Sequence, residues 1–214
     1  MTNRSFSNPY VHKVKEFPGI VFEKDELNTF VRSITLPIIL DIGCGNGEYL
    51  TDIASKFPNN FYIGFDLQYK EVYRTALKIK KMGLKNCVVS KMNALEVPDL
   101  FNKDELVGAL ILFPDPWPKT QQKKNRLINI AYVQKLASKM KKGSFLKIRT
   151  DNDDYFLHML KVLYDDKIQE LLKTEELSRD YYKAITTKVE YITPFERIFL
   201  RDGSLINYIL LKRL

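Results

Sequence analysis

Apolar residues along the chain fall into short runs, separated by longer segments in which polar residues intervene. Five runs rich in Ile, Val and Leu are nearly continuous, as is typical of strands covered on both faces. These runs span residues 37–42, 61–65, 87–90, 106–112 and 145–149. The alternation predicts βα units and an α/β fold, with a mostly parallel central sheet and helices on both faces.

The intervening segments predict helices at 48–56, 69–82 and 128–141, because their apolar residues recur at intervals of three and four. Met82-Gly83 and Lys142-Gly143 resemble common helix ends, with a glycine after the last turn. A further helix is predicted at 153–164. The charged stretch that follows, to about residue 180, shows no defined pattern.

Two more elements are predicted near the C-terminus. Thr193-Pro-Phe-Glu-Arg has the composition of a helix start, and residues 205–211 form an apolar strand. The Asp202-Gly203 pair suits a tight turn, so we expect the last strand to be antiparallel and paired through that turn.

The first 35 residues mix basic and aromatic side chains with weak periodicity, so we expect this segment to be partly disordered until a partner binds. The other residues, 36–214, are enough for one sizeable core and too few for two. We therefore expect a single domain at 36–214, preceded by a basic and aromatic segment at 1–35.

Charge and cysteine content narrow the classes of partner and site. The 34 Lys and Arg outnumber the 26 Asp and Glu, which gives a net charge of +8 and favours a polyanionic partner. Cys44 and Cys87 have no neighbour at zinc-ligand spacing, so neither a metal site nor a disulfide is expected. We find no signal sequence and no apolar run long enough to cross a bilayer, which predicts a cytoplasmic protein.

The strongest local motif is the segment from Ile39 to Glu48, in which a strand runs into a loop with Gly43, Gly45 and Gly47. Glycines there let the backbone approach a ligand at the carboxyl end of the first strand. A dinucleotide fingerprint would need its third glycine at the position of Glu48. The spacing therefore disfavours NAD and suits S-adenosylmethionine (SAM), whose adenosine carries no pyrophosphate.

Polar residues at the ends of three strands complete this prediction. Asp66 ends the second strand, where a carboxylate reaches ribose hydroxyls, although it could instead cap the helix that starts near Gln68. Asp41 can face the cationic amino group of the methionine part of SAM. Asn93 follows the third strand, and its amide is expected to reach the adenine.

A proline-rich loop follows the fourth strand and carries the candidate reaction chemistry. In Pro114-Asp-Pro-Trp-Pro-Lys119, the prolines fix the backbone, so Asp115 and Trp117 point in set directions. The alternative is a rigid turn with Trp117 packed in the core. Lys123, Lys124 and Arg126 come next and are expected to contact phosphates, although charge runs are more often solvated helix faces.

Four segments together resemble the bacterial tRNA (guanine-N7-)-methyltransferase family in order and spacing. They are the loop at 41–47, Phe113-Pro-Asp-Pro-Trp-Pro-Lys119, Thr150-Asp151-Asn152 and Thr193-Pro-Phe-Glu196. The resemblance extends from about residue 36 to the end of the chain. It implies a Rossmann-like class I SAM-dependent methyltransferase that acts on a guanine in the variable loop of tRNA. Separately, we expect no obligatory protein partner and a monomer or homodimer.

The resemblance also implies roles for individual residues. Asp41, Asp66 and Asn93 would bind SAM together with the three glycines, and Asp115 would bind SAM or act at the reacting centre. Lys119, Asp151, Thr193 and Glu196 would hold the substrate. The family often has Glu at positions 41 and 66, Asp at 93, and a more basic stretch at 120–122.

Guanine N7 carries a lone pair and no proton, so its methylation needs alignment rather than a general base. A carboxylate such as Asp115 or Glu196 would stabilise the positive charge that appears on the guanine. Two alternatives stay open: a methyltransferase acting on an exocyclic amino group of a base, and a tRNA-binding subunit without turnover.

Overall fold

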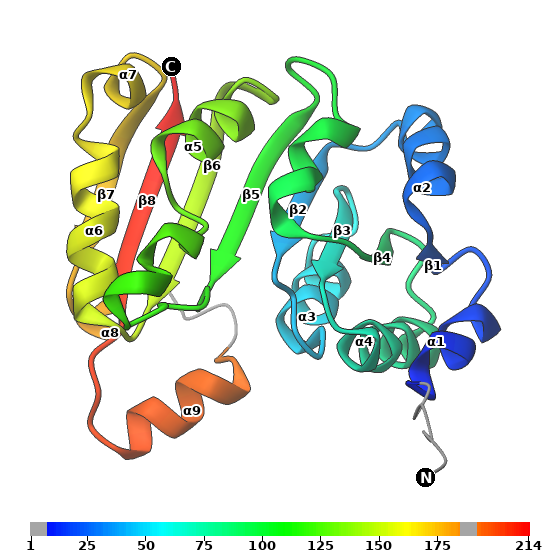
Figure 1. Ribbon diagram of the computed structural model, residues 1–214. Coiled ribbons are helices and arrows are strands. Elements are labelled where there is room, and N and C mark those ends of the chain that lie inside the picture. Colours follow the sequence, from blue (N-terminus) through cyan, green and yellow to red (C-terminus); the bar gives the residue numbers. More distant parts are fainter. Residues whose placement is uncertain (1–7, 185–191) are drawn as a thin grey trace, which may run out of the picture.

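The computed structural model describes residues 8–184 and 192–214. Eight strands form one sheet in the order β1-β4-β3-β2-β5-β6-β8-β7 (Figure 1). The strands are β1 Val21–Phe22, β2 Ile38–Ile42, β3 Phe61–Asp66, β4 Cys87–Lys91, β5 Leu106–Leu112, β6 Met140–Thr150, β7 Leu172–Ser178 and β8 Asn207–Arg213. Strands β1 to β6 are parallel, and β8 is antiparallel to both β6 and β7. The predicted α/β fold with an antiparallel strand near the C-terminus is confirmed.

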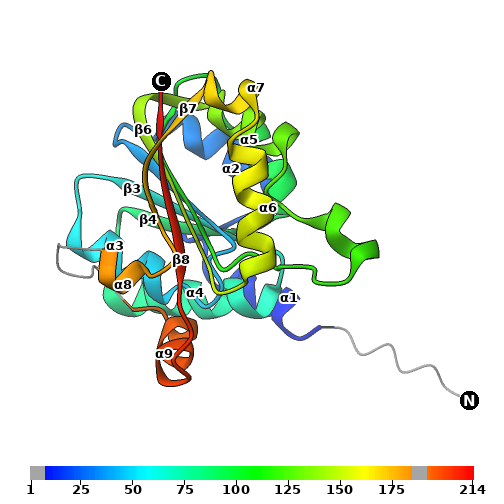
Figure 2. The ribbon, with the colours of Figure 1, turned by 90° about the vertical axis from the view of Figure 1, so that its left-hand side faces the viewer.

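Helices cover both faces of the sheet because each carries an apolar stripe. They are α1 Tyr10–Lys13, α2 Lys24–Phe30, α3 Glu48–Lys56, α4 Tyr69–Met82, α5 Ile130–Ala137, α6 Asp153–Leu163, α7 Asp166–Gln169, α8 Tyr181–Ala184 and α9 Pro194–Arg201, with 3-10 turns η1 Val14–Glu16, η2 Val31–Ser33, η3 Ala94–Leu100 and η4 Thr120–Asn125. One core lies between the sheet and α2, α5 and α6, and a second lies beneath α3 and α4 (Figure 2).

Most predicted elements are confirmed to within two residues, and Gly83 ends α4 in the left-handed conformation as expected. The predicted helix at 128–141 is too long. Helix α5 ends at Ala137, and β6 begins at Met140, whose side chain is fully buried beside Leu106. Lys142-Gly143 therefore lies in an irregular part of β6 and caps no helix, because burial of Met140 outweighs the helical pattern.

The predicted role of Asp202-Gly203 is also wrong. These residues end α9, where the amide of Ser204 donates to the carbonyl of Phe199 at 2.9 Å and Gly203 has a φ of 71°. Strand β8 starts later, at Asn207, and pairs with β6 and β7. The charged stretch after residue 164, which shows no defined pattern in sequence, contains α7 and β7.

Part of the N-terminal segment packs against the sheet, and the expectation that the segment is partly disordered stays a prediction. Strand β1 pairs with β4, and Leu27 of α2 and Val14 of η1 are buried. The elements there are short, which explains why periodicity did not indicate them. Residues 1–7 lie outside the described residues, and the division into a segment at 1–35 and a domain at 36–214 stays a prediction. No helix within 8–184 or 192–214 has the length and apolar character to cross a membrane.

Candidate active site

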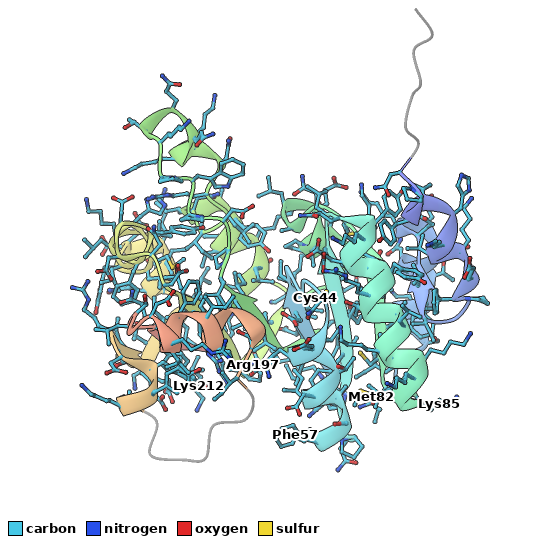
Figure 3. The ribbon with its side chains drawn as sticks, turned by 90° about the horizontal axis from the view of Figure 1, so that it is seen from below. Cys44, Phe57, Met82, Lys85, Arg197 and Lys212 are labelled. Atoms are coloured by element: carbon cyan, nitrogen blue, oxygen red, sulfur yellow. The ribbon has the colours of Figure 1, made fainter. Side chains whose placement is uncertain are left out.

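The carboxyl ends of the parallel strands bring the predicted site residues to one edge of the sheet. Asp41 of β2 lies between Gly64 of β3 and Leu110 of β5 in the strand register. Asp66 ends β3, and Asp115 follows β5 by three residues. In Figure 3, which looks onto this edge, the glycine loop marked by Cys44 lies centrally and α9 crosses beside it.

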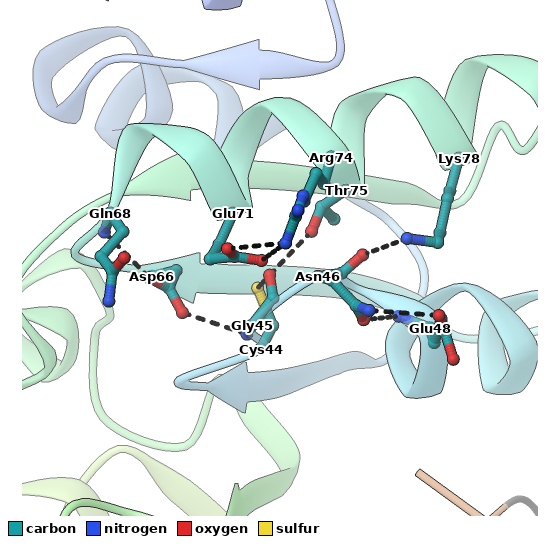
Figure 4. Close-up of polar contacts among 10 residues, drawn as sticks. All are labelled: Cys44, Gly45, Asn46, Glu48, Asp66, Gln68, Glu71, Arg74, Thr75 and Lys78. Carbon is teal, nitrogen blue, oxygen red and sulfur yellow. Dashed lines mark hydrogen bonds and ion pairs between the residues drawn. The ribbon is translucent and has the colours of Figure 1, made fainter. Parts of the chain in front are cut away.

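The glycine loop is held in shape by α4 (Figure 4). Gly43, Gly45 and Gly47 all have positive φ, between 54° and 85°. The Thr75 hydroxyl donates to the carbonyl of Gly45 at 3.1 Å, and the Lys78 ammonium donates to that of Asn46 at 2.8 Å. A Cβ at position 47 would lie 2.5 Å from Thr75. The loop thus needs glycine both for its conformation and for close approach to α4.

Asp66 fastens the same loop from β3. Its carboxylate accepts from the amide of Gly45 at 3.0 Å and from the amide of Gln68 at 2.8 Å. The second bond is local and lies before the helix: Gln68 is the N-cap residue of α4, and no side chain caps this helix, so Asp66 does not take the capping role that the sequence left open. Burial raises the pKa of Asp66, although the backbone hydrogen bonds oppose the shift. Asp66 therefore links the glycine loop to the residue before α4, and its half-buried carboxylate lies at the end of β3.

Asp41 is a buried carboxylate whose negative charge is not balanced by a partner among the described residues. Its residue is 2% exposed, and no hydrogen bond from the described residues reaches its oxygens. Burial, with the nearby charge of Asp66, raises the pKa of Asp41 to about 7. Such a group costs free energy in the free protein unless a cation pairs with it. The site thus fits a ligand that carries a positive charge, as the methionine part of SAM does.

Asn93 lies beside Asp66 but makes a local bond. The amide of Met92 donates to the carbonyl of Asp66, which places the end of β4 next to the end of β3. The Asn93 side chain is exposed, and its Oδ1 accepts from the amide of Leu95 to cap η3. Its Nδ2 group is the part of the amide that remains for a ligand.

The proline-rich loop after β5 has an unusual backbone. Phe113 and Trp117 have φ values of 56° and 44°, in the left-handed region that non-glycine residues rarely adopt. The amide of Phe113 donates to the carbonyl of Arg149 at 2.9 Å, which fixes the start of the loop to β6. Asp115 is exposed and Trp117 is half-buried. Strained residues of this kind cluster at functional sites, where the surrounding structure maintains them.

Arg126 supports this loop and is not placed to bind phosphate. Its side chain is 2% exposed, and its Nε donates to the carbonyl of Pro116 at 2.9 Å. The guanidinium also pairs with Asp154 and stacks over the Tyr155 ring at 4.8 Å. The predicted phosphate contact at Arg126 is therefore corrected, because the residue is buried and its polar partners belong to the protein.

The other basic residues in and after the loop differ in how exposed they are and in whether they already form an ion pair within the protein. Lys123 pairs with Asp154 at 3.0 Å and is 39% exposed. Lys119 and Lys124 are exposed and have no ion-pair partner within residues 8–184 and 192–214. Asp151 follows β6 at the same edge and is also exposed. Lys119, Lys124 and Asp151 are thus the side chains best placed to meet a substrate.

The side chains of Thr193 and Glu196 form hydrogen bonds with other residues of the protein. They form a capping box at the start of α9, in which each side chain bonds the other's amide. The second carboxylate oxygen of Glu196 accepts from Arg149 at 2.8 Å, and the side chains of this ion pair are completely buried. With both oxygens engaged, Glu196 holds α9 to β6 rather than presenting a free carboxylate.

Arg149 is a central residue that our sequence interpretation missed. Burial lowers the pKa of Arg149, but the charge of Glu196, the Tyr49 and Tyr181 side chains and the hydrogen bond to Glu196 together outweigh burial and raise the pKa. Its guanidinium lies 3.8 Å from the centre of the Tyr181 ring and donates to the hydroxyl of that residue. The signal was an arginine in a strand otherwise rich in apolar residues, since a buried charge requires a partner.

Helix α9 also connects to the glycine loop. Arg197, next to Glu196, donates to Glu48 at 2.9 Å, and Glu48 is the first residue of α3 after Gly47. Two consecutive residues of α9 therefore join the end of β6 to the start of α3 across the carboxyl edge.

Comparison with known proteins identifies the family. The family model described as "Putative methyltransferase" matches residues 35–206. The tRNA (guanine-N(7)-)-methyltransferase of Nitrosomonas eutropha is 34% identical over 191 residues, which are 88% of this chain and 82% of that protein. The chain belongs to the tRNA (guanine-N7-)-methyltransferase family. The enzyme of the same description from Cytophaga hutchinsonii is 32% identical over 81% of this chain and 78% of its own.

This methyltransferase also resembles solved structures in fold. The 16S rRNA (adenine(1408)-N(1))-methyltransferase from Catenulisporales acidiphilia, solved as a point mutant with its cosubstrate SAM, superposes with a TM-score of 0.59 at 17% identity. The match covers 89% of this chain and 91% of that one. The class I methyltransferase architecture predicted from the sequence is thereby confirmed.

Proposed function

We propose that the protein transfers the methyl group of SAM to N7 of a guanine in tRNA. The observation that carries the proposal is the carboxyl edge of the sheet, where β2 and β3 carry Asp41 and Asp66 and β5 leads into the strained loop of Asp115, in a chain of this family. The variable-loop guanine, the cytoplasmic location and a monomeric or dimeric state belong to the same proposal and derive from the sequence.

The chain offers a distinct group for each part of SAM. Asp41 would pair with the ammonium group, and this ion pair would offset the free-energy cost of burying an unpaired carboxylate. Asp66 would accept from the ribose hydroxyls while it continues to hold the loop through Gly45. Asn93 would donate to the adenine. When bound, SAM supplies an electrophilic methyl group on its sulfonium.

The acceptor side of the reaction needs alignment and charge stabilisation. Guanine N7 has a lone pair and no proton, so no side chain has to remove one before or during transfer. Positive charge grows on the guanine, and the Asp115 carboxylate would stabilise it from the stiff loop. The same carboxylate can accept from N1–H and the exocyclic amine, which selects guanine over adenine.

The substrate would be held by the exposed groups around this edge. Lys119 and Lys124 would contact phosphates, and Asp151 would lie beside the target nucleotide. Thr193 and Glu196 would act by placing α9, because their polar atoms are engaged within the protein.

The proposal is tested with unmodified tRNA transcripts and labelled SAM. We expect one 7-methylguanine, located by mass spectrometry and by strand scission at that base. Asp115→Ala should lower kcat by at least about a hundredfold and leave SAM binding and the melting temperature near those of the wild type. Methylation at an exocyclic amine would instead support the alternative enzyme, and tRNA binding without SAM binding would indicate a non-catalytic subunit.

A further inference from the structure

One face of the sheet is left open at its C-terminal half. Helices α5 and α6 cover one side of β5, β6 and β8, where Leu146, Ile148 and Leu211 are buried. On the opposite side, α3 and α4 pack over β2, β3 and β4, and α8 and α9 pack near Tyr208. Among the described residues, no helix covers the remaining part of this side of β6, β8 and β7 (Figure 2).

A row of four residues crosses this open area in strand register. Gly108 of β5 lies beside Phe145 of β6, Phe145 beside Lys212 of β8, and Lys212 beside Lys173 of β7. A Cβ at position 108 would lie 2.4 Å from the Phe145 ring. The ring therefore rests on bare backbone and is only half-buried. We call Phe145, Lys212 and Lys173 the Phe145 face.

The two lysines of this face are placed against each other. Like charges directly opposite on paired strands destabilise a sheet. Both side chains are exposed, and neither has an ion-pair partner in the described part of the chain. The acids of β7, Glu175 at the register shift and Glu176 opposite Leu210, lie beyond the Thr174–Leu211 pair. An anionic ligand across the two lysines would remove this repulsion.

A small aromatic cavity adjoins the face. Its volume is about 170 Å³, and its lining includes Tyr49, Tyr62, Phe145 and Lys147. Pockets for whole drug-sized ligands are larger, at roughly 300–1,000 Å³. The cavity therefore suits at most a single ring system that enters beside Phe145.

We propose that the Phe145 face binds an unpaired stretch of the substrate tRNA, an inference that rests on the proposed function. A base would stack on Phe145, and the flanking phosphates would lie against Lys212 and Lys173. Sheet surfaces that combine a solvent-accessible aromatic ring with cations bind single-stranded nucleic acid in this way, because every base has a π-face and every linkage a charge, and the half-buried Phe145 has part of its ring accessible.

The test compares tRNA affinity between paired variants over a range of KCl concentrations. Lys173→Ala with Lys212→Ala should weaken binding at least fivefold and lower the salt slope by roughly 0.7 per lost contact. The matched control, Lys161→Ala with Lys167→Ala, removes two exposed lysines from α6 and α7 on the other face. It should change neither quantity.

Phe145→Leu tests the stacking step separately, because it keeps an apolar side chain over Gly108. We expect about fivefold to tenfold weaker tRNA binding at an unchanged salt slope. An unstructured RNA 12-mer should compete with tRNA for binding to the wild type. The same 12-mer should compete much more weakly for binding to the lysine variant. Equal affinity in all variants, or competition only by fully paired RNA, would overturn the inference. Formation of 7-methylguanine by the wild type tests the proposed function independently.

Discussion

Asp41 shows how one side chain can link ligand binding to pH. Burial raises its pKa to about 7 in the free protein, well above its ordinary value of 3.8. The folded state therefore binds a proton more tightly than the unfolded chain does. The resulting contribution to stability is fully present below about pH 4 and is lost as the pH rises through 7.

We predict that SAM affinity increases between pH 5.5 and 7.5, because the ionised carboxylate pairs with the ammonium group. Binding at pH 6.5 should release protons, which calorimetry in buffers of different ionisation enthalpy detects. Asp41→Asn should weaken binding, abolish the proton release and reduce the loss of stability between pH 4 and 7. A wild type whose SAM affinity is flat over this range would show that Asp41 does not face the cation.

At the scale of elements, the proline-rich loop depends on a support behind it. Arg126 holds the carbonyl of Pro116 from a buried position, whereas Lys124 nearby is exposed. The sequence predicted both as phosphate contacts. It could not separate them, because a run of cations does not reveal which side chain turns inward toward Asp154.

We predict opposite effects for these neighbours. Arg126→Met should lower kcat at least tenfold at a nearly unchanged salt slope of tRNA binding, because the loop that carries Asp115 loses its anchor. Lys124→Ala should lower the salt slope by about one unit and leave kcat at saturating tRNA intact. The measurements are single-turnover kinetics and binding at several KCl concentrations. A lowered salt slope of tRNA binding for Arg126→Met would show that Arg126 does contact a phosphate, contrary to our interpretation of the structure.

Helix α9 is held to β6 by the buried ion pair of Arg149 and Glu196. We predict that variants of this pair can regain stability without regaining a normal KM for tRNA. Arg149→Met should cost about 3–5 kcal/mol, because the buried Glu196 carboxylate loses its cationic partner and keeps its backbone hydrogen bond from Thr193. Arg149→Met with Glu196→Leu should recover most of that loss. The double variant should still raise the KM for tRNA, because α9 loses its defined position.

Arg149→Lys serves as the control for this pair. It keeps the charge, so it should retain most of the stability and a KM for tRNA closer to that of the wild type. Denaturant unfolding and steady-state kinetics provide both readouts. A double variant that is both stable and normal in KM would show that the ion pair does not position α9.

At the scale of the whole molecule, the parallel half of the fold followed from local patterns. Strands β2 to β5 are mostly apolar because both faces are covered, and Gly47 before α3 and Gly83 after α4 mark boundaries that the sequence displays. Only part of the C-terminal half followed: α6, the start of α9 and the antiparallel β8 were predicted, whereas β7 and the start of β6 were not. Strand β7 is an exposed edge with charged residues, and the start of β6 is set by packing of Met140 against β5.

The candidate site divides in the same way. The glycine loop and the acids at strand ends follow from the position of each residue relative to its own strand. Arg149, Thr75 and Lys78 act across the fold on residues 47, 30 and 32 positions away in sequence, so no local pattern indicates them. The proximity of α9 to the glycine loop likewise appears only in three dimensions.

The most direct test replaces only the acceptor atom. Transcripts of the same tRNA would be prepared with guanine or with 7-deazaguanine, in which a C–H group stands where N7 would be. The protein should bind both, as measured by filter binding, and should transfer labelled methyl from SAM to the guanine transcript alone. Methylation of the 7-deazaguanine transcript at a comparable rate would contradict the account, because the acceptor would then be another atom.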